Sequence, residues 1–407
     1  DPAIAEVDLG VADLRAGGGQ VGLRGQDVEP RDGLNVVTTL DARIQSIVEM
    51  AMAEAFREYG PVNASCVVMR PRTGEILAMS SIPNFDPNRY PDGRPEVFRN
   101  RIISDLCEPG STFKIVVVSA GLHEGTVNLK SPFDCENGLF TYAKRTLHDH
   151  EKYGVLSVEQ IITKSSNIGA AKIGIQLGEI RLYDYMRRFG FGEVTGIPLP
   201  AEARGIIPQV REWSGVTIAQ IPMGHGVAVT PLQMVMAMSA IANKGTLMRP
   251  MLVKRLEESS GNVVVSWEPR INKQVIGPAA ARDMVEALKT VVSKDGTGPK
   301  AHLENYTVAG KTGTAQKVEN GTYSKTKYFA SFIGFFPADE PEICIGVFLD
   351  EPKGKGYYGG QVAAPAFQAI AEKLARYLNI RPDIQPEEPG ARAITVKLPG
   401  PALTFVP

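Results

Sequence analysis

Residues 108–122 read EPGSTFKIVVVSAGL. Pro109-Gly110 is a turn signal, and the segment that follows is long enough for a helix and apolar nearly all round. A helix of this kind is typical of the interior of a large protein. The sequence therefore predicts a buried helix between Gly110 and Gly125, with Ser111 at or near its N-terminus.

Ser111 and Lys114 form a Ser-x-x-Lys pattern at the start of this helix. Lys114 follows Ser111 at i+3, on the same face and one turn later. Burial disfavours the charged ammonium and lowers the pKa of a lysine, and a neutral amine can take the proton of a neighbouring hydroxyl. The positive end of the helix dipole would help to stabilise the resulting alkoxide. We therefore interpret Ser111 as a nucleophile and Lys114 as its base.

A Ser-x-x-Lys pattern occurs by chance about once or twice in a chain of this length, so the setting of each match decides its value. A second match, Ser324-Lys325-Thr326-Lys327, lies among polar and charged residues, where no desolvation of the lysine is expected. The buried setting favours Ser111 over Ser324 as the nucleophile.

Composition sets broad limits on function. The chain has 407 residues, of which 43% are hydrophobic and 22% charged, as in an ordinary globular protein of one large domain or two. A net charge of −1 gives no support for nucleic-acid binding. The four cysteines are widely spaced without a Cys-x-x-Cys pair, so their spacing does not suggest a zinc site. We expect neither a metal nor a cofactor. Cys66 and Cys344 lie in apolar strand-like segments and are expected to be buried thiols, although spacing alone leaves a disulfide open.

The sequence predicts strands at both ends of one domain and helices between them. The expected strands cover residues 35–40, 62–69, 75–80, 306–309, 328–336 and 343–349. The expected helices begin near Asp41 and Ser157 and cover residues 167–177, 180–189, 230–243, 278–293 and 364–378, whereas 130–155 is expected to be irregular. This order indicates an α/β fold of the α+β type, with an antiparallel sheet flanked by helices and a helical subdomain inserted.

The domain is expected to span residues 34–380. Residues 1–33 are rich in glycine and charge, and we interpret them as a linker or a remnant of an upstream domain, with one short strand near residues 21–23. Residues 381–407 are expected to be a loose tail. The chain begins at Asp1 without a methionine or signal peptide, which indicates a trimmed or processed fragment. No apolar segment approaches the roughly 18 residues of a membrane span.

Two further motifs carry polar groups suited to a cleft. Ser165-Ser166-Asn167 lies in the break between two predicted helices, where a hydroxyl and an amide two residues apart can point into a cleft; a plain helix cap is the alternative. Lys311-Thr312-Gly313-Thr314 lies on a predicted strand, where Gly310 and Gly313 would let another backbone approach. This arrangement suits a peptide ending in a carboxylate, laid alongside the strand; an exposed polar strand is the alternative.

In this order, Ser-x-x-Lys, Ser-x-Asn and Lys-Thr-Gly resemble the signature of penicillin-binding proteins and serine β-lactamases. The similarity extends over about residues 30–380, and it is closest to the transpeptidase domain of class B penicillin-binding proteins of the cell-division (septal) or sporulation branch. The stretches that carry it are residues 34–45, 224–226, 230–233, 311–316, 357–360 and 363–365.

The resemblance implies a peptidoglycan D,D-transpeptidase that cross-links stem peptides through a serine acyl-enzyme, acts in septal wall synthesis, and is inhibited covalently by β-lactams. Ser111 would attack the D-Ala-D-Ala bond with Lys114 as base, and the backbone N–H groups of Ser111 and Thr314 would form the oxyanion hole. The remaining roles are proton relay to the leaving amine by Ser165 and Lys311, support of the peptide or of Lys114 by Asn167, and carboxylate binding by Lys311, Thr312, Gly313 and Thr314.

The resemblance also implies an upstream inner-membrane anchor and pedestal domain, a periplasmic or extracellular catalytic domain, and membrane-protein partners from cell division or elongation. Three alternatives remain open. A β-lactamase would need a group that activates the deacylating water, and none is identified. A D,D-carboxypeptidase would use water as acceptor. A non-enzymatic division scaffold or β-lactam sensor would show a lost nucleophile or lysine, whereas every motif residue is intact.

Overall fold

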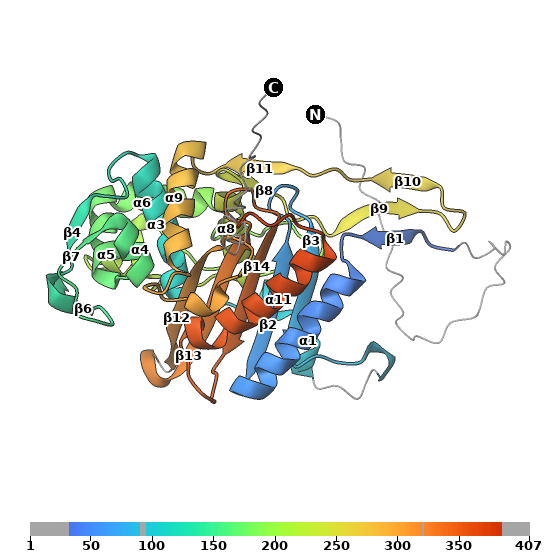
Figure 1. Ribbon diagram of the computed structural model, residues 1–407, viewed down its shortest axis with the longest axis horizontal. Helices are drawn as coiled ribbons and strands as arrows, with labels where there is room; N and C mark the ends of the chain where they lie inside the picture. Colours follow the sequence, from blue (N-terminus) through green and yellow to red (C-terminus); the bar gives the residue numbers. More distant parts are fainter. Residues whose placement is uncertain (1–31, 90–94, 320, 385–407) are drawn as a thin grey trace, which may run out of the picture.

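The computed structural model describes residues 32–89, 95–319 and 321–384 (Figure 1). The strand predicted near residues 21–23 and most of the expected tail therefore lie outside the described residues. Of that tail, residues 381–384 are described, and Asp383 accepts a hydrogen bond from the Thr307 N–H at 2.8 Å. The described part confirms the α/β fold with an antiparallel sheet and an inserted helical region.

The central sheet has five antiparallel strands, in the order β12-β13-β14-β2-β3. The two ends of the domain meet where β14 pairs with β2 and Ile345 lies opposite Val68. The sheet is thus built from both ends of the domain, as predicted. The strands are β2 (Asn63–Met69), β3 (Ile76–Ile82), β12 (Ala309–Glu319), β13 (Thr322–Phe336) and β14 (Ile343–Asp350).

Two helices, α1 (Ala42–Tyr59) and α11 (Ala364–Tyr377), cover one face of this sheet and lie in front of it in Figure 1. The alternation along β2 explains the two faces. Cys66 packs with these helices, whereas Val67 points to the opposite face, because successive strand residues alternate between faces. Asp41 accepts hydrogen bonds from two N–H groups in the first turn of α1, which confirms the predicted N-cap.

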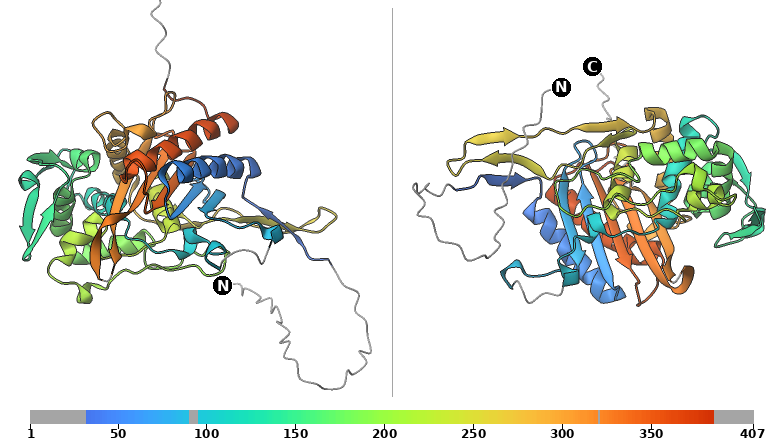
Figure 2. Two further views of the ribbon diagram at one scale, coloured as in Figure 1. Left: turned by 90° about the horizontal axis from the view of Figure 1, so that it is seen from below. Right: turned by 180° about the vertical axis from the view of Figure 1, so that it is seen from behind.

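The other face of the sheet packs against α8 (Pro231–Ala242), which is buried along its whole length. The helical region lies beyond β12, at one end of the sheet in both Figure 1 and Figure 2. Residues 114–121 run through its centre and are all buried, as the apolar sequence predicts. Its main helices are α3 (Lys114–His123), α4 (Val158–Lys164), α5 (Asn167–Leu177), α6 (Glu179–Arg188) and α9 (Pro278–Thr290).

The prediction of irregular structure over residues 130–155 was wrong. This segment holds the short strands β4 (Pro132–Asp134), β5 (Leu139–Tyr142) and β6 (Arg145–His148) and the start of β7 (Val155–Ser157). β4 pairs with β7 and β5 with β6. The hairpin turn between β5 and β6 has positive φ at both Ala143 and Lys144. Tight hairpin turns of this kind favour Asn and Gly, so the residues present here gave no turn signal.

A second group of strands also escaped prediction. β1 (Asn35–Thr38), β9 (Val253–Glu257) and β10 (Val263–Ser266) form a small sheet that extends from the domain beyond β3 in Figure 1. Only β1 was predicted. The pair β8 (Thr246–Met248) and β11 (Ile271–Gln274) was missed as well. These strands are three to five residues long, too short for a clear period of two.

The four cysteines are free thiols, and Cys66 and Cys344 are buried in β2 and β14 as predicted. Burial raises the pKa of the Cys66 thiol. Among the helices that the structure describes, none combines the length and the apolar character needed to cross a bilayer.

Candidate active site

Ser111 lies in a short 3₁₀ turn, Gly110–Phe113, that leads directly into α3 at Lys114. The predicted helix therefore begins as a tighter turn, and Ser111 sits just ahead of the α-helix proper. Lys114 is 0% exposed in the first turn of α3, and its Nζ lies 2.9 Å from Ser111 Oγ. The predicted nucleophile and its predicted base are thus within hydrogen-bond distance.

The break between α4 and α5 presents Ser165 and Asn167 to the same lysine. Lys114 Nζ donates to the backbone oxygen of Ser165 at 2.5 Å and to Asn167 Oδ1 at 2.8 Å, and it lies 3.2 Å from Ser165 Oγ. Ser166 serves as the N-cap of α5, because its Oγ accepts the Gly169 N–H at 2.9 Å. Both interpretations of the motif therefore hold, for different residues: the middle serine caps the helix and its two neighbours face the site.

Lys311 on β12 completes the group from the sheet side. It is 0% exposed, and its Nζ donates to Ser165 Oγ at 2.8 Å and to the backbone oxygen of Thr312 at 3.1 Å. The Ser165 hydroxyl thus bridges the amines of Lys114 and Lys311. The structure brings together the five residues predicted to be catalytic, Ser111, Lys114, Ser165, Asn167 and Lys311, from three separate parts of the chain.

The electrostatics of this group suit proton transfer. Burial lowers the pKa of Lys114 to about 7, and the charge of Asp149 partly opposes this shift. Burial and the charge of Lys114 hold the pKa of Lys311 well below its ordinary value. An ammonium has three N–H donors, yet four oxygen atoms surround Lys114 Nζ. A neutral Lys114 amine can donate twice and accept the Ser111 O–H with its lone pair.

The segment 311–314 lies on β12, an edge strand of the central sheet. Among the described strands, β12 pairs with β13 alone. Thr312 Oγ1 lies 2.7 Å from Thr297 Oγ1, and Thr314 Oγ1 accepts the Gly359 N–H at 3.0 Å. A Cβ at position 313 would lie 2.4 Å from the Ser331 hydroxyl oxygen and 2.9 Å from Thr112 Cγ2. Glycine therefore lets β12 pass close to the turn that carries Ser111.

The loop 224–226 supports the nucleophile turn from behind. A Cβ at position 224, where φ is +80°, would lie 2.1 Å from the Gly110 carbonyl oxygen. Glu108 Oε1 accepts the Gly226 N–H at 2.8 Å, so this loop is also bonded to the segment just before the turn. Burial and the charge of Lys114 lower the pKa of His225 to about 4, so this imidazole is neutral near pH 7.

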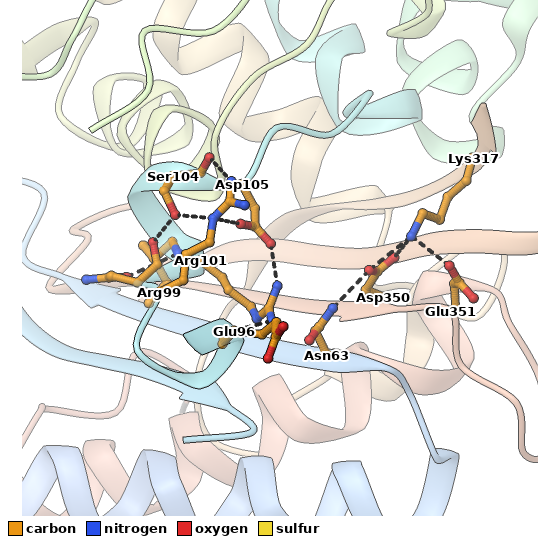
Figure 3. Close-up of polar contacts among 11 residues, drawn as sticks. Asn63, Glu96, Arg99, Arg101, Ser104, Asp105, Lys317, Asp350 and Glu351 are labelled. Carbon is orange, nitrogen blue, oxygen red and sulfur yellow. Dashed lines mark hydrogen bonds and ion pairs between the residues drawn. The ribbon is translucent and has the colours of Figure 1, made fainter. Parts of the chain in front are cut away.

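A pocket of about 400 Å³ lies alongside the second half of β12. Ala315, Gln316 and Lys317 line it, and Figure 3 shows two groups of ion-paired side chains in its walls. Lys317 Nζ lies 2.9 Å from Asp350 Oδ1, on one side of the pocket. Asp105, on the other, contacts the guanidinium groups of two nearby arginines. Among the described residues, no cluster of three histidine, cysteine or carboxylate side chains is placed to hold a metal ion.

Sequence reasoning missed Asp149. Its carboxylate accepts hydrogen bonds from Ser166 and from the first N–H groups of α5, directly behind the catalytic group. It lies 16 residues before Ser165, in a segment predicted to be irregular, and no local pattern connects it with a helix start. The only sequence signal was a single acidic residue between His148 and His150.

The fold and the three motifs define the class that comprises penicillin-binding proteins and serine β-lactamases. A family profile described as the penicillin binding protein transpeptidase domain matches residues 64–372. The chain belongs to the penicillin-binding protein transpeptidase family.

Known proteins agree with this assignment. Stage V sporulation protein D of Bacillus subtilis (strain 168) is 39% identical over 357 residues, which are 87% of this chain and 55% of that protein. The probable peptidoglycan D,D-transpeptidase PbpC of Pseudomonas aeruginosa is 32% identical over 88% of this chain and 62% of its own length. The chain thus spans a little over half the length of these curated relatives.

Among solved structures, penicillin-binding protein 3 of Mycobacterium tuberculosis in complex with aztreonam has a TM-score of 0.80 and 34% sequence identity. The match covers 86% of this chain and 80% of that one. The sporulation and penicillin-binding protein 3 relatives confirm the resemblance to class B proteins of the division and sporulation branch.

Proposed function

We propose that this chain is the catalytic domain of a peptidoglycan D,D-transpeptidase, which cross-links stem peptides through an acyl-enzyme on Ser111 during septal wall synthesis and is acylated by β-lactams. The observation that carries the proposal is the hydrogen-bonded series from Ser111 through Lys114 and Ser165 to Lys311, at the free edge of β12. The name of the Pseudomonas relative and the aztreonam complex of the Mycobacterium structure support it.

Acylation begins with a donor peptide along the edge of β12. Its terminal carboxylate binds near Lys311, Thr312 and Thr314, which places the scissile carbonyl at Ser111. Neutral Lys114 takes the Ser111 proton as Oγ attacks, and the N–H groups of Ser111 and Thr314 stabilise the oxyanion. As the C–N bond breaks, the proton passes by way of Ser165 to the leaving D-Ala amine.

The pocket beside β12 can accommodate the part of the donor peptide that precedes the scissile bond. We place the donor peptide antiparallel to β12, with its C-terminal carboxylate near Thr312. Its residues nearer the N-terminus then lie beside Thr314 and, further on, beside Val318. Each residue advances about 3.4 Å along the strand. Residues just before the scissile bond therefore lie beside Ala315 and Gln316, which line the pocket.

The acyl-enzyme is resolved by an amine of a second stem peptide. Hydrolysis instead requires a water held at the ester carbonyl and a base to deprotonate it. Asp149, the carboxylate whose charge acts on Lys114, is engaged by three donors behind the site. Water is therefore a poor acceptor, which separates this proposal from a β-lactamase.

We expect the penicilloyl-enzyme to persist for at least many minutes, with negligible turnover of the drug. The measurement is a time course of intact mass after excess penicillin is removed. An adduct that disappears within seconds, with many drug molecules hydrolysed per protein, would identify a β-lactamase and reject the transpeptidase proposal.

Replacing Thr312 with valine keeps the side-chain shape and removes the hydroxyl that lies 2.7 Å from Thr297. We expect T312V to slow acylation by a carboxylate-bearing β-lactam by about tenfold, the loss of one charge-assisted hydrogen bond. The control is the same β-lactam with its carboxylate esterified, whose rate should fall far less. Equal losses for both compounds would show that Thr312 does not contact the carboxylate.

The site of action follows from the substrate, since peptidoglycan lies outside the cytoplasmic membrane. We infer that a segment upstream of this domain anchors it there and docks division or elongation proteins. Protease added to spheroplasts that make the full-length protein tests the location: degradation of this domain supports it, and protection contradicts it.

A further inference from the structure

Asp149 follows directly after β6 and contacts the start of α5 through three hydrogen bonds. Its Oδ2 accepts the Ser166 O–H at 2.7 Å. Its Oδ1 accepts the Asn167 N–H through a short contact and the Ile168 N–H at 3.1 Å. Because Ser166 already caps α5 through the Gly169 N–H, this carboxylate acts as a second cap that fixes where the helix begins.

The same segment fixes the orientation of Asn167. Asn167 Nδ2 donates to the backbone oxygen of His148 at 2.9 Å, while its Oδ1 accepts from Lys114 Nζ at 2.8 Å. Residues 148–149 therefore hold both the backbone and the amide of Asn167. A displacement of this segment would move the oxygen atoms of Ser165 and Asn167 away from the base.

Asp149 also contributes negative charge to a site that has two buried amines. Lys114 and Lys311 share the Ser165 hydroxyl, and two ammonium ions in such contact repel each other. Two histidines also interact electrostatically with Lys114: His150, on the same loop as Asp149, and His225, on the loop behind Ser111. Burial lowers the pKa of both imidazoles, and the positive charge of Lys114 lowers it further. Burial lowers the pKa of Lys114, and the negative charge of Asp149 opposes this shift.

We propose that Asp149 is a positioning residue of the catalytic site: its carboxylate fixes the turn 165–167 against Lys114 and supplies the negative charge that balances the two buried lysine side chains. The inference rests on the proposed acylation of Ser111 by Lys114. It goes beyond the three motifs, because it makes the protonation state of Lys114 depend on a residue that belongs to none of them.

The test is the pH dependence of the second-order acylation constant, measured between pH 5 and 9 with a fluorescent penicillin. Asp149→Asn keeps the shape and can still accept the N–H groups of Asn167 and Ile168, but it removes the charge. Removing the charge lowers the pKa of Lys114, so its amine is neutral at lower pH. We expect the acidic limb of the profile to move about one pH unit lower, with a lower plateau because the base is weaker.

Two matched variants separate charge from shape. Glu151→Gln removes a neighbouring carboxylate that contacts Tyr153, and its acidic limb should stay at the wild-type position. Ser166→Ala keeps the charge of Asp149 but removes one of its three hydrogen bonds, so the plateau should fall while the limb stays in place. Rates are normalised to the amount of protein that can be acylated, so the pH midpoint of the acidic limb can still be measured for a partly unfolded variant.

A profile of Asp149→Asn whose acidic limb coincides with that of the wild type would overturn the inference and leave Asp149 as a structural cap. The same holds if Glu151→Gln or Ser166→Ala moves the limb as far as Asp149→Asn does. A wild-type protein that penicillin never acylates would instead contradict the proposed function, so the two failures are distinguishable.

Discussion

Substituting Ser111 with alanine is expected to reduce the covalent penicillin adduct from one per protein to none. The hydroxyl is the group that forms the ester bond, and neither Lys114 nor Ser165 can replace it from its position behind Ser111. The side chain is half-buried in a 3₁₀ turn against which Gly224 and Gly313 pack closely. These contacts do not involve the Ser111 hydroxyl, so S111A should keep its fold. Intact-mass spectrometry after exposure to penicillin measures the adduct, and thermal unfolding checks the fold.

Ser324→Ala is the matched control, because Ser324 belongs to the second Ser-x-x-Lys match. Its Oγ accepts the Lys327 N–H at 3.3 Å, and the Lys327 side chain contacts Glu319 instead of the serine. S324A should therefore label as fully as the wild type. Residual labelling of S111A, or an adduct mapped to Ser324, would refute the assignment of the nucleophile.

The burial and placement of the candidate site residues could be predicted in part, because each motif carries a local signal. A lysine one turn after a serine in an apolar segment predicts a buried amine, and Lys114 is fully buried. Lys-Thr-Gly on a predicted strand likewise suited a peptide laid alongside that strand, and β12 is an edge strand of the sheet that the structure describes. The meeting of Ser111, Ser165 and Lys311 followed from family resemblance, because residues so far apart in sequence leave no local trace of their contact.

The position of Asp149 at the site could not be predicted from the sequence. Its function depends on a chain reversal at Ala143-Lys144 that returns the hairpin β5–β6 to the start of α5, and neither residue is typical of such a turn. The strands β8 to β11 were missed for a related reason, since strands of three to five residues are too short to show a clear hydrophobic period. The long apolar strands β2, β3 and β14 were predicted close to their observed bounds, because continuous burial leaves a continuous apolar sequence. The strand predicted over residues 306–309 was wrong in its bounds, since β12 begins at Ala309 and runs to Glu319.

Replacing Lys114 with methionine is expected to slow acylation by on the order of 10²–10⁴, the usual effect of removing a general base. Methionine keeps the unbranched shape and fits a fully buried position, but it cannot accept the Ser111 proton. Lys311, Thr312 and Thr314 are unchanged, so reversible binding of the β-lactam should survive. Stopped-flow fluorescence separates this binding step from the covalent step.

The pH dependence of acylation by the wild type is a second measurement that tests Lys114 as the base. The pKa of Lys114 is lowered to about 7, so acylation should fall as the pH drops below 7 and the amine takes up a proton. K114M has no such group and should lose this limb. Replacing the half-buried Lys327 with methionine should change neither the rate nor the profile, because its contact is with Glu319. Acylation of K114M within about tenfold of the wild type, with the acidic limb intact, would assign the base to another residue, and the lowered pKa of Lys311 makes it the next to test.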